Sequence, residues 1–161
     1  MGKEVIYGSD GSVIEGIIIK YYEEGKVMSE TPYVDGKKNG TEIEYYYNGI
    51  ISARNEYVND ELNGICYVYY QSGTIMEENV YKNSKRNGVC KVYYDTGVVK
   101  QESEYQRDVL HGKVTRYSPE GLLEEVIYYR KGTLVREHPS EVREEVKVPE
   151  KLSESELSKL L

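Results

Sequence analysis

A repeat of 24 residues constrains the fold of this chain more than any other feature of its sequence. Three columns of identical residues recur at this spacing without a single insertion. They are a glycine column of Gly16, Gly40, Gly64, Gly88 and Gly112, a second glycine column of Gly25, Gly49, Gly73, Gly97 and Gly121, and a tyrosine column of Tyr33, Tyr57, Tyr81, Tyr105 and Tyr129. Internal periods of this length are typical of arrays whose units stack on their neighbours and share one core. The sequence therefore predicts a repeat protein.

Each repeat is expected to form two β-strands joined by a tight turn. The first strand is short, β-branched and aromatic and ends at a tyrosine pair, and the second runs from the next glycine to the single tyrosine. Between them lie EEG, YNG, QSG, DTG and PEG, where glycine supplies the positive φ of a hairpin turn. We expect an all-β fold, an elongated antiparallel β-meander, with tyrosine rings that touch along the ribbon. The expected core stripe is the aliphatic column Val27, Ile51, Ile75, Val99 and Leu123.

The pattern divides the chain into three parts. Residues 1–15 look like a degenerate N-terminal repeat, residues 16–135 hold five repeats, and residues 136–161 form a C-terminal capping or tail segment. Residues 141–148 alternate valine with charge, which suits an edge strand or a short helix equally well. The sequence SESE at 153–156 is a capping box, so we expect a short C-terminal helix there. That helix would either cap the open sheet or dock onto a partner or a second copy.

Composition and charge exclude several classes of function. The chain has 18 tyrosines but no phenylalanine or tryptophan, so we expect buried tyrosine rings whose hydroxyls stay at a wet boundary. The net charge of -7 argues against nonspecific binding to nucleic acid or anionic lipid, which need a positive patch. Neither a secretory signal nor a spanning run of about 18 apolar residues is visible, so we expect a cytoplasmic protein.

The sequence offers no recognisable catalytic or metal-binding motif. His111 and His138 each stand alone in their local sequence, and isolated loop histidines are usually solvated. Cys66 and Cys90 occupy the same slot of adjacent repeats, which places their Cα atoms about 10 Å apart, too far for a disulfide. Two thiols without matching histidines make no zinc site. We therefore expect no enzyme activity, no cofactor, no metal site and no disulfide.

An acidic column offers the one further candidate site. Glu30, Glu78 and Glu102 share a repeat position, but Arg54 interrupts the series. We interpret these side chains as a solvated strand face rather than a cation site.

With the repeat written out, the chain resembles the MORN repeat, and more closely the bacterial MORN variant. The resemblance covers about residues 16–135 and is carried by YYEEGKVMSETPY, YYNGIISARNEY, YYQSGTIMEENVY and YYDTGVVKQESEY. It implies an elongated β-meander. Bacterial chains of this type are often filed as antitoxins of toxin–antitoxin pairs, and the kinase and methyltransferase domains that accompany MORN repeats elsewhere have no counterpart here.

Two classes of function remain open. The first is a noncatalytic protein-binding scaffold, such as the neutralising partner of a basic protein, and the second is a lipid- or small-ligand-binding module. Tyrosine offers a large contact area at low entropic cost, which suits recognition. The candidate partner-binding residues are Tyr22, Tyr46, Tyr70 and Tyr94. Membrane binding is disfavoured by the acidic balance, and self-association through the sheet ends or the C-terminal helix is a further expectation.

Overall fold

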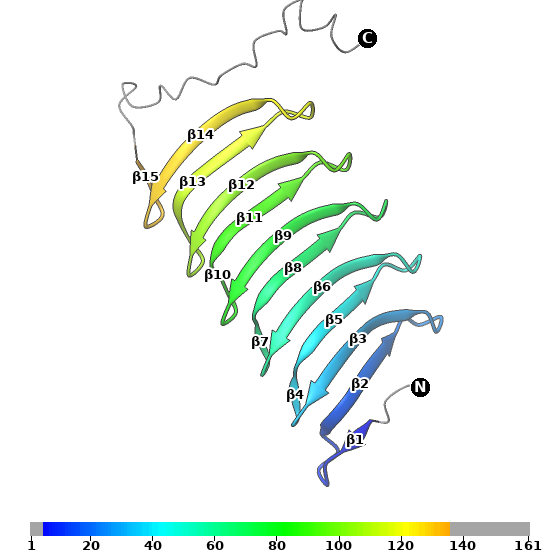
Figure 1. The fold of residues 1–161 in the computed structure, drawn as a ribbon. Coiled ribbons are helices and arrows are strands. Elements are labelled where there is room, and N and C mark those ends of the chain that lie inside the picture. Colours follow the sequence, from blue (N-terminus) through cyan, green and yellow to red (C-terminus); the bar gives the residue numbers. More distant parts are fainter. Residues whose placement is uncertain (1–4, 136–161) are drawn as a thin grey trace, which may run out of the picture.

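The computed structural model describes residues 5–135, and every regular element in that range is a β-strand. The strands form one antiparallel sheet in which the spatial order follows the order along the chain, as Figure 1 shows. The first described strand lies at one end of the array and the last at the other, so each repeat lengthens the sheet along one axis. The expectation of an antiparallel β-meander is confirmed.

Five hairpins of long strands make up most of the sheet. They are β2 (Val13–Tyr21) with β3 (Val27–Val34), β5 (Gly40–Tyr45) with β6 (Ile51–Val58), β8 (Gly64–Tyr69) with β9 (Ile75–Lys82), β11 (Gly88–Tyr93) with β12 (Val99–Gln106), and β13 (Val109–Tyr117) with β14 (Leu123–Arg130). The described sheet ends in two short strands, β1 (Ile6–Tyr7) and β15 (Thr133–Val135). Short end strands limit the unpaired backbone edge.

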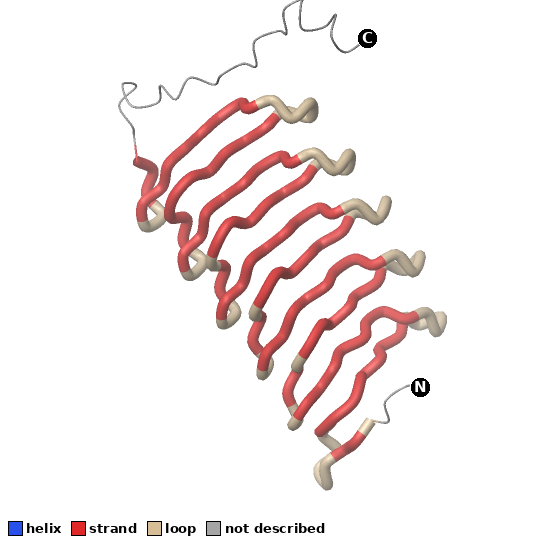
Figure 2. Tube along the Cα trace, in the orientation of Figure 1, coloured by secondary structure: helices blue, strands red, loops and turns tan. Residues whose placement is uncertain are grey.

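Tight turns close the hairpins where the sequence places glycine. In the first hairpin the amide of Gly25 donates to the carbonyl of Tyr22 at 2.9 Å, and Gly25 has a φ of 79°. The other hairpins repeat this arrangement, and all these turns lie along one edge of the sheet in Figure 2. Glycine is needed here because a Cβ atom makes a positive φ unfavourable.

The links between repeats are more regular than loops. Three two-residue strands fold back onto the preceding long strand, namely β4 (Lys37–Lys38) on β3, β7 (Glu61–Leu62) on β6 and β10 (Lys85–Arg86) on β9. Successive links also bind one another, since the Asp60 carboxylate accepts from the amide of Lys38 at 2.8 Å and Asp108 accepts likewise from Arg86 at 2.9 Å. The sequence predicted two strands in each repeat and no strand in these links.

Strand pairing is extensive within a hairpin and sparse at three of the four junctions between repeats; the exception is β12 with β13, which pair at five positions. Strands β8 and β9 are in register from Gly64 opposite Tyr81 to Val68 opposite Glu77, before a bulge near the turn. By contrast, β9 and β11 pair only at Glu78–Lys91 and Glu77–Val92. The junctions between β3 and β5 and between β6 and β8 are equally short. Side chains therefore matter for holding one repeat to the next.

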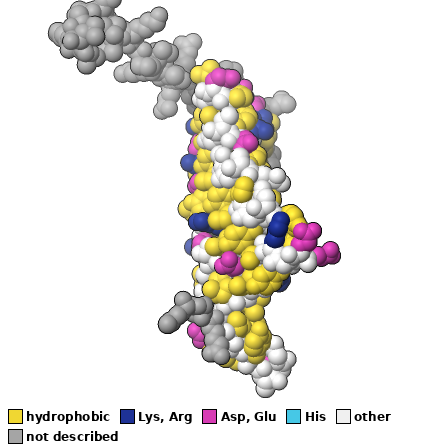
Figure 3. Space-filling model, turned by 90° about the vertical axis from the view of Figure 1, so that its right-hand side faces the viewer, with side chains coloured by type: hydrophobic (Ala, Val, Ile, Leu, Met, Phe, Trp, Pro, Cys, Tyr) yellow, Lys and Arg dark blue, Asp and Glu magenta, His cyan; other side chains and the backbone are white. Residues whose placement is uncertain are grey.

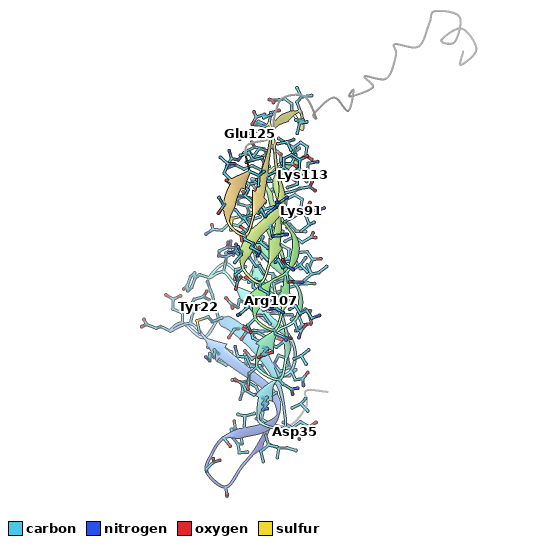
Figure 4. All side chains as sticks on the ribbon, turned by 90° about the vertical axis from the view of Figure 1, so that its left-hand side faces the viewer. Tyr22, Asp35, Lys91, Arg107, Lys113 and Glu125 are labelled. Carbon is cyan, nitrogen blue, oxygen red and sulfur yellow. The ribbon has the colours of Figure 1, made fainter. Side chains whose placement is uncertain are left out.

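The sheet is a single layer, so its core is thin and lies on one face. Figure 4 looks along the layer and shows side chains projecting from both sides. The buried hydrophobic residues are Cys66, Cys90 and Val114, and we call the side that carries them the cysteine face. The opposite side, which carries Glu30, Glu78 and Glu102, is the glutamate face.

The predicted core stripe is wrong as a core. Val27, Ile51, Ile75 and Val99 are only half-buried, and Leu123 is 53% exposed. These side chains lie on the glutamate face near the turns, where no second layer covers them. The more deeply buried residues lie across the middle of the strands and are partly polar: Ser29, Thr31, Glu42 and Ser103 on the cysteine face and Thr115 on the glutamate face.

The fold class requires one correction. The prediction added a short C-terminal helix to the β-meander, but the described residues contain strands and no helix. The segments 141–148 and 153–161 lie outside the described residues. Where the described array ends, β15 adds a short strand to β14, so backbone pairing rather than helix packing terminates that part of the chain.

Candidate functional site

The four tyrosines predicted to contact a partner lie at the turn ends of the hairpins, and each is hydrogen-bonded to the next repeat. The Tyr70 hydroxyl donates to the carbonyl oxygen of Tyr93 at 2.7 Å. The same bond runs from Tyr22 to Tyr45 at 2.6 Å, from Tyr46 to Tyr69 at 2.5 Å and from Tyr94 to Tyr117 at 3.0 Å. All four donors are half-buried. Their hydroxyls thus link repeats, and contact of their rings with a partner stays a prediction.

The tyrosine rings of one column do not stack on each other, which corrects a further expectation. The aromatic pairs among the described residues are Tyr22 with Tyr47, whose centroids are 5.5 Å apart, and Tyr67 with Tyr69 at 6.3 Å. Neither pair joins members of one column. Equivalent residues are separated by two strands, or about 10 Å, which is beyond ring contact.

Two of the four predicted tyrosines border a polar groove on the cysteine face. The groove lies over the first two repeats and has a volume of about 560 Å³. Tyr22 and Tyr46 line it together with Lys38, Glu42 and Glu44. Tyr70 and Tyr94 are not among its lining residues. The structure therefore does not bring the four tyrosines together at one groove.

Glu42 is a buried carboxylate at the base of this groove, and sequence reasoning missed it. Its Oε1 accepts from the Thr31 hydroxyl at 2.8 Å and from the Lys38 ammonium at 2.7 Å, and its Oε2 accepts weakly from the Asn55 amide at 3.5 Å. Burial by itself raises the pKa of Glu42, but the bonds from Lys38 and Thr31 outweigh it and hold that pKa below its usual value. The sequence did carry a signal, because Glu42 is the one charged residue at its repeat position. The equivalent positions in the other repeats hold Ile18, Cys66, Cys90 and Val114.

The two thiols are free and buried on the same face. Cys66 lies opposite Asn79 in the hairpin of the third repeat, and Cys90 lies opposite Ser103 in the next. Burial raises the pKa of each thiol. Both therefore behave as small core residues rather than as activated nucleophiles.

The glutamate face carries a repeated pair of a tyrosine and a carboxylate. The Tyr45 hydroxyl donates to Glu30 at 3.1 Å and the Tyr93 hydroxyl donates to Glu78 at 3.2 Å. Burial, with the charge of Glu78, raises the pKa of Tyr93 to about 12. These glutamates are half-buried acceptors, whereas Arg54, which interrupts their column, is exposed. The interpretation as a fully solvated face is therefore too simple.

Cations of the chain rest on tyrosine rings at several points. The Nζ of Lys38 lies 4.6 Å from the Tyr57 ring centroid, and the Arg86 guanidinium lies 4.1 Å from that of Tyr105. Each cation also meets a carboxylate, Glu42 for Lys38 at 2.7 Å and Asp108 for Arg86 at 3.3 Å. At these two points a tyrosine ring and a carboxylate together hold a cation of the chain.

The histidine singled out by sequence is not part of a catalytic arrangement. His111 is exposed, and its Nδ1 accepts from the backbone amide of Lys131 at 3.3 Å. The open depression beside it, about 430 Å³, is lined by basic, amide and apolar residues without a carboxylate, hydroxyl or thiol. His138 lies outside the described residues.

The described part of the chain contains neither a cluster of metal-ligating side chains nor a membrane-spanning helix. Over residues 5–135, no three His, Cys, Asp or Glu side chains are grouped so that they could hold a metal ion. That same range contains no helix with the length and hydropathy needed to cross a membrane.

Comparison with known proteins identifies the repeat. The family model described as "MORN repeat variant" matches residues 14–35, 38–59, 62–83 and 86–107, which is more than half of the chain. No curated protein matches the chain. MORN repeats are noncatalytic modules associated with protein and membrane-lipid interaction. From these four consecutive matches, on a sheet built of the expected hairpins, we conclude that the chain belongs to the MORN repeat variant family.

Proposed function

We propose that this chain is a noncatalytic scaffold that binds a basic protein, in the manner of a neutralising antitoxin. The observation that carries the proposal is the uncovered glutamate face. Its large apolar side chains that are more than a third exposed include Ile17, Ile19, Tyr21, Ile65 and Val89. Exposed apolar residues gathered on one face of a folded protein are typical of an interaction surface. Their carboxylate neighbours and the net charge of -7 favour a partner rich in lysine and arginine.

The shape of the molecule supports binding to a protein more than to a small molecule. A single-layer sheet presents a broad, regular surface, and in Figure 3 hydrophobic side chains extend along much of the turn edge, interrupted by charged groups of both signs. Protein interfaces bury about 800 Å² on each partner, which a sheet of this length supplies easily.

The four tyrosines at the hairpin ends have a narrower role in this proposal. Since the hydroxyls of Tyr22, Tyr46, Tyr70 and Tyr94 are engaged within the chain, only their ring surfaces remain for a partner. We therefore place the main contact on the glutamate face.

A pull-down from the native cell tests the proposal. The tagged full chain is compared with Ile65→Arg/Val89→Arg, which puts two positive charges on the glutamate face. The matched control is Ile14→Arg/Leu134→Arg, which adds the same charge at two exposed positions on the cysteine side of the sheet. Circular dichroism checks that both variants fold.

The expected result is one stoichiometric protein that the control retains and the face variant loses. If both variants retain it, the glutamate face is not the interface. If no protein is retained and the unmodified chain instead sediments with vesicles of phosphatidylserine and phosphatidylcholine in a salt-sensitive way, the chain is a lipid-binding module. If neither partner nor vesicle is bound, the scaffold proposal fails.

A further inference from the structure

One line of side chains crosses the whole glutamate face. It is formed by residues directly opposite each other on successive strands, so its members are neighbours in space. In order across the sheet they are Ile19, Glu30, Ile43, Arg54, Tyr67, Glu78, Lys91, Glu102, Thr115 and Val126. The three carboxylates of this line have different surroundings.

Two of the carboxylates have a cation of the chain beside them. Lys91 lies between Glu78 and Glu102 in the line, and its Nζ is 3.5 Å from Glu102. Glu30 instead lies between two aliphatic residues, Ile19 and Ile43. No ion pair to Glu30 occurs within residues 5–135. Lys91 belongs to β11 and lies far up the array from the first hairpin, whose turn carries Tyr22 in Figure 4.

A pocket opens beside Glu30, and its walls suit a cationic side chain. It has a volume of about 420 Å³ and is lined by Lys26, Val27, Glu30, Tyr45, Tyr47, Asn48 and Gly49. The Tyr45 hydroxyl donates to Oε1 of Glu30, which fixes the carboxylate and leaves its other oxygen free to accept. The pocket therefore combines a positioned carboxylate, a tyrosine ring and an aliphatic wall.

The same combination already holds cations elsewhere in this chain. Lys38 between Tyr57 and Glu42, and Arg86 between Tyr105 and Asp108, show that a tyrosine ring and a carboxylate accept either type of basic side chain here. In the Glu30 pocket, residues 5–135 supply the ring and the carboxylate but no cation paired with the carboxylate.

Lys26 is the chain's own competitor for this pocket. Its Nζ lies 3.9 Å from the centroid of the Tyr47 ring, at the rim. The Tyr47 hydroxyl in turn donates to Glu24, which adds a negative charge at the same rim. Lys26 is exposed, so it can turn into solvent when another cation enters.

We propose that the pocket beside Glu30 receives one lysine or arginine side chain of the protein partner. This inference rests on the proposed scaffold function, because it names the chemistry by which that partner is recognised. The inserted cation would pair with Glu30, lie against Tyr45 and cover Val27. Charge-assisted hydrogen bonds in a partly desolvated site are among the stronger polar contacts in an interface.

The test is an NMR titration of the full chain with a defined probe. The probe is the acetylated and amidated peptide Gly-Gly-Arg-Gly-Gly, and its control has citrulline, the neutral isostere, in place of arginine. Amide shifts should be confined to residues 26–30 and 45–49 with the arginine peptide and absent with the citrulline peptide. Glu30→Gln should weaken binding about fivefold or more, the loss expected for one charged contact.

Two further variants make the test decisive. Glu61→Gln removes the same charge from an exposed site in β7 and should leave the affinity within about twofold of the unmodified chain, since surface charges at a distance are screened. Lys26→Met removes the competing cation, keeps the pocket walls and should tighten binding about twofold to fivefold. It also tests the pocket if Glu30→Gln does not fold.

Several outcomes would refute the proposal that the pocket receives a cationic side chain. They are shifts spread over the acidic surface, equal binding of the citrulline peptide, equal losses in Glu30→Gln and Glu61→Gln, or weaker binding by Lys26→Met. These results can be distinguished from results that refute the proposed scaffold function. A partner captured equally by the unmodified chain and Glu30→Gln leaves the scaffold standing and removes the pocket, whereas a peptide bound at the pocket with no cellular protein partner removes the scaffold.

Discussion

Replacing Tyr70 by phenylalanine tests whether tyrosine hydroxyls hold the repeats together. The change deletes one oxygen and keeps the ring. It removes the 2.7 Å hydrogen bond to the Tyr93 carbonyl, which bridges the turn of one hairpin to β11 of the next. Since β9 and β11 pair at only two positions, this bond supplies a sizeable part of the junction.

The expected loss in the free energy of unfolding follows from the type of hydrogen bond and from how deeply it is buried. A neutral, half-buried hydrogen bond contributes about 1 kcal/mol net to the free energy of unfolding, within a range of about 0.5–1.5 kcal/mol. With a urea m value of about 2 kcal/mol/M, Tyr70→Phe should lower the unfolding midpoint by about 0.5 M. Changing Tyr22, Tyr46, Tyr70 and Tyr94 together should cost about 4 kcal/mol, because well-separated sites add. That is a large share of a typical stability of about 5–15 kcal/mol.

Urea unfolding followed by circular dichroism measures the effect. The matched control is Tyr67→Phe, which makes the same change on the glutamate face, where the described residues give that hydroxyl no hydrogen-bond partner. A midpoint for Tyr70→Phe no lower than that of Tyr67→Phe would refute the reasoning. A lower m value would mean that the array no longer unfolds as one unit.

Three further changes probe the cysteine face and the repeat geometry. Glu42→Gln should flatten the acid side of a profile of unfolding free energy against pH. Because the pKa of Glu42 is lowered in the folded chain, the stability that its carboxylate contributes is present above about pH 4.5 and is lost as the pH falls through the folded pKa. A variant that still loses as much stability in acid as the unmodified chain would contradict this. Gly88→Ala should cost about 1–3 kcal/mol in thermal unfolding, since Gly88 has a φ of 132° at the start of β11, and an unchanged Tm would show that this strand position tolerates a Cβ. Cys66 and Cys90 should react with a thiol reagent at neutral pH only as fast as the chain opens, because burial shields both sulfurs and also raises their pKa. Rapid reaction of the folded chain would disprove their burial.

Local patterning made the architecture predictable from sequence. The glycine at each hairpin turn and the strand on either side follow from backbone sterics and side-chain alternation, which are properties of short segments. The links were predicted less well. Their short strands, such as Lys85–Arg86, depend on bonds between successive links, including Asp108 to the amide of Arg86, which join positions far apart in the chain.

Prediction of the candidate sites from sequence was limited in the same way. The tyrosine columns were visible in the sequence, but the alternation of faces decides that Tyr45 meets Glu30 while Tyr46 meets the Tyr69 carbonyl. The contrast between Glu30 and Glu78 could not be read from the acidic column, because it depends on which residues lie opposite on neighbouring strands.

The sequence by itself determined the repeat, the two strands in each unit, the turns and therefore the β-meander, because a 24-residue period with fixed glycines admits few other structures. Only the tertiary structure decided which face is buried, which hydroxyls join the repeats and which carboxylate lies in a pocket with no ion pair to it from the described residues. The physical reason is that burial, hydrogen bonding and charge pairing are set by cross-strand neighbours, and the register that chooses those neighbours exists only once the sheet has formed.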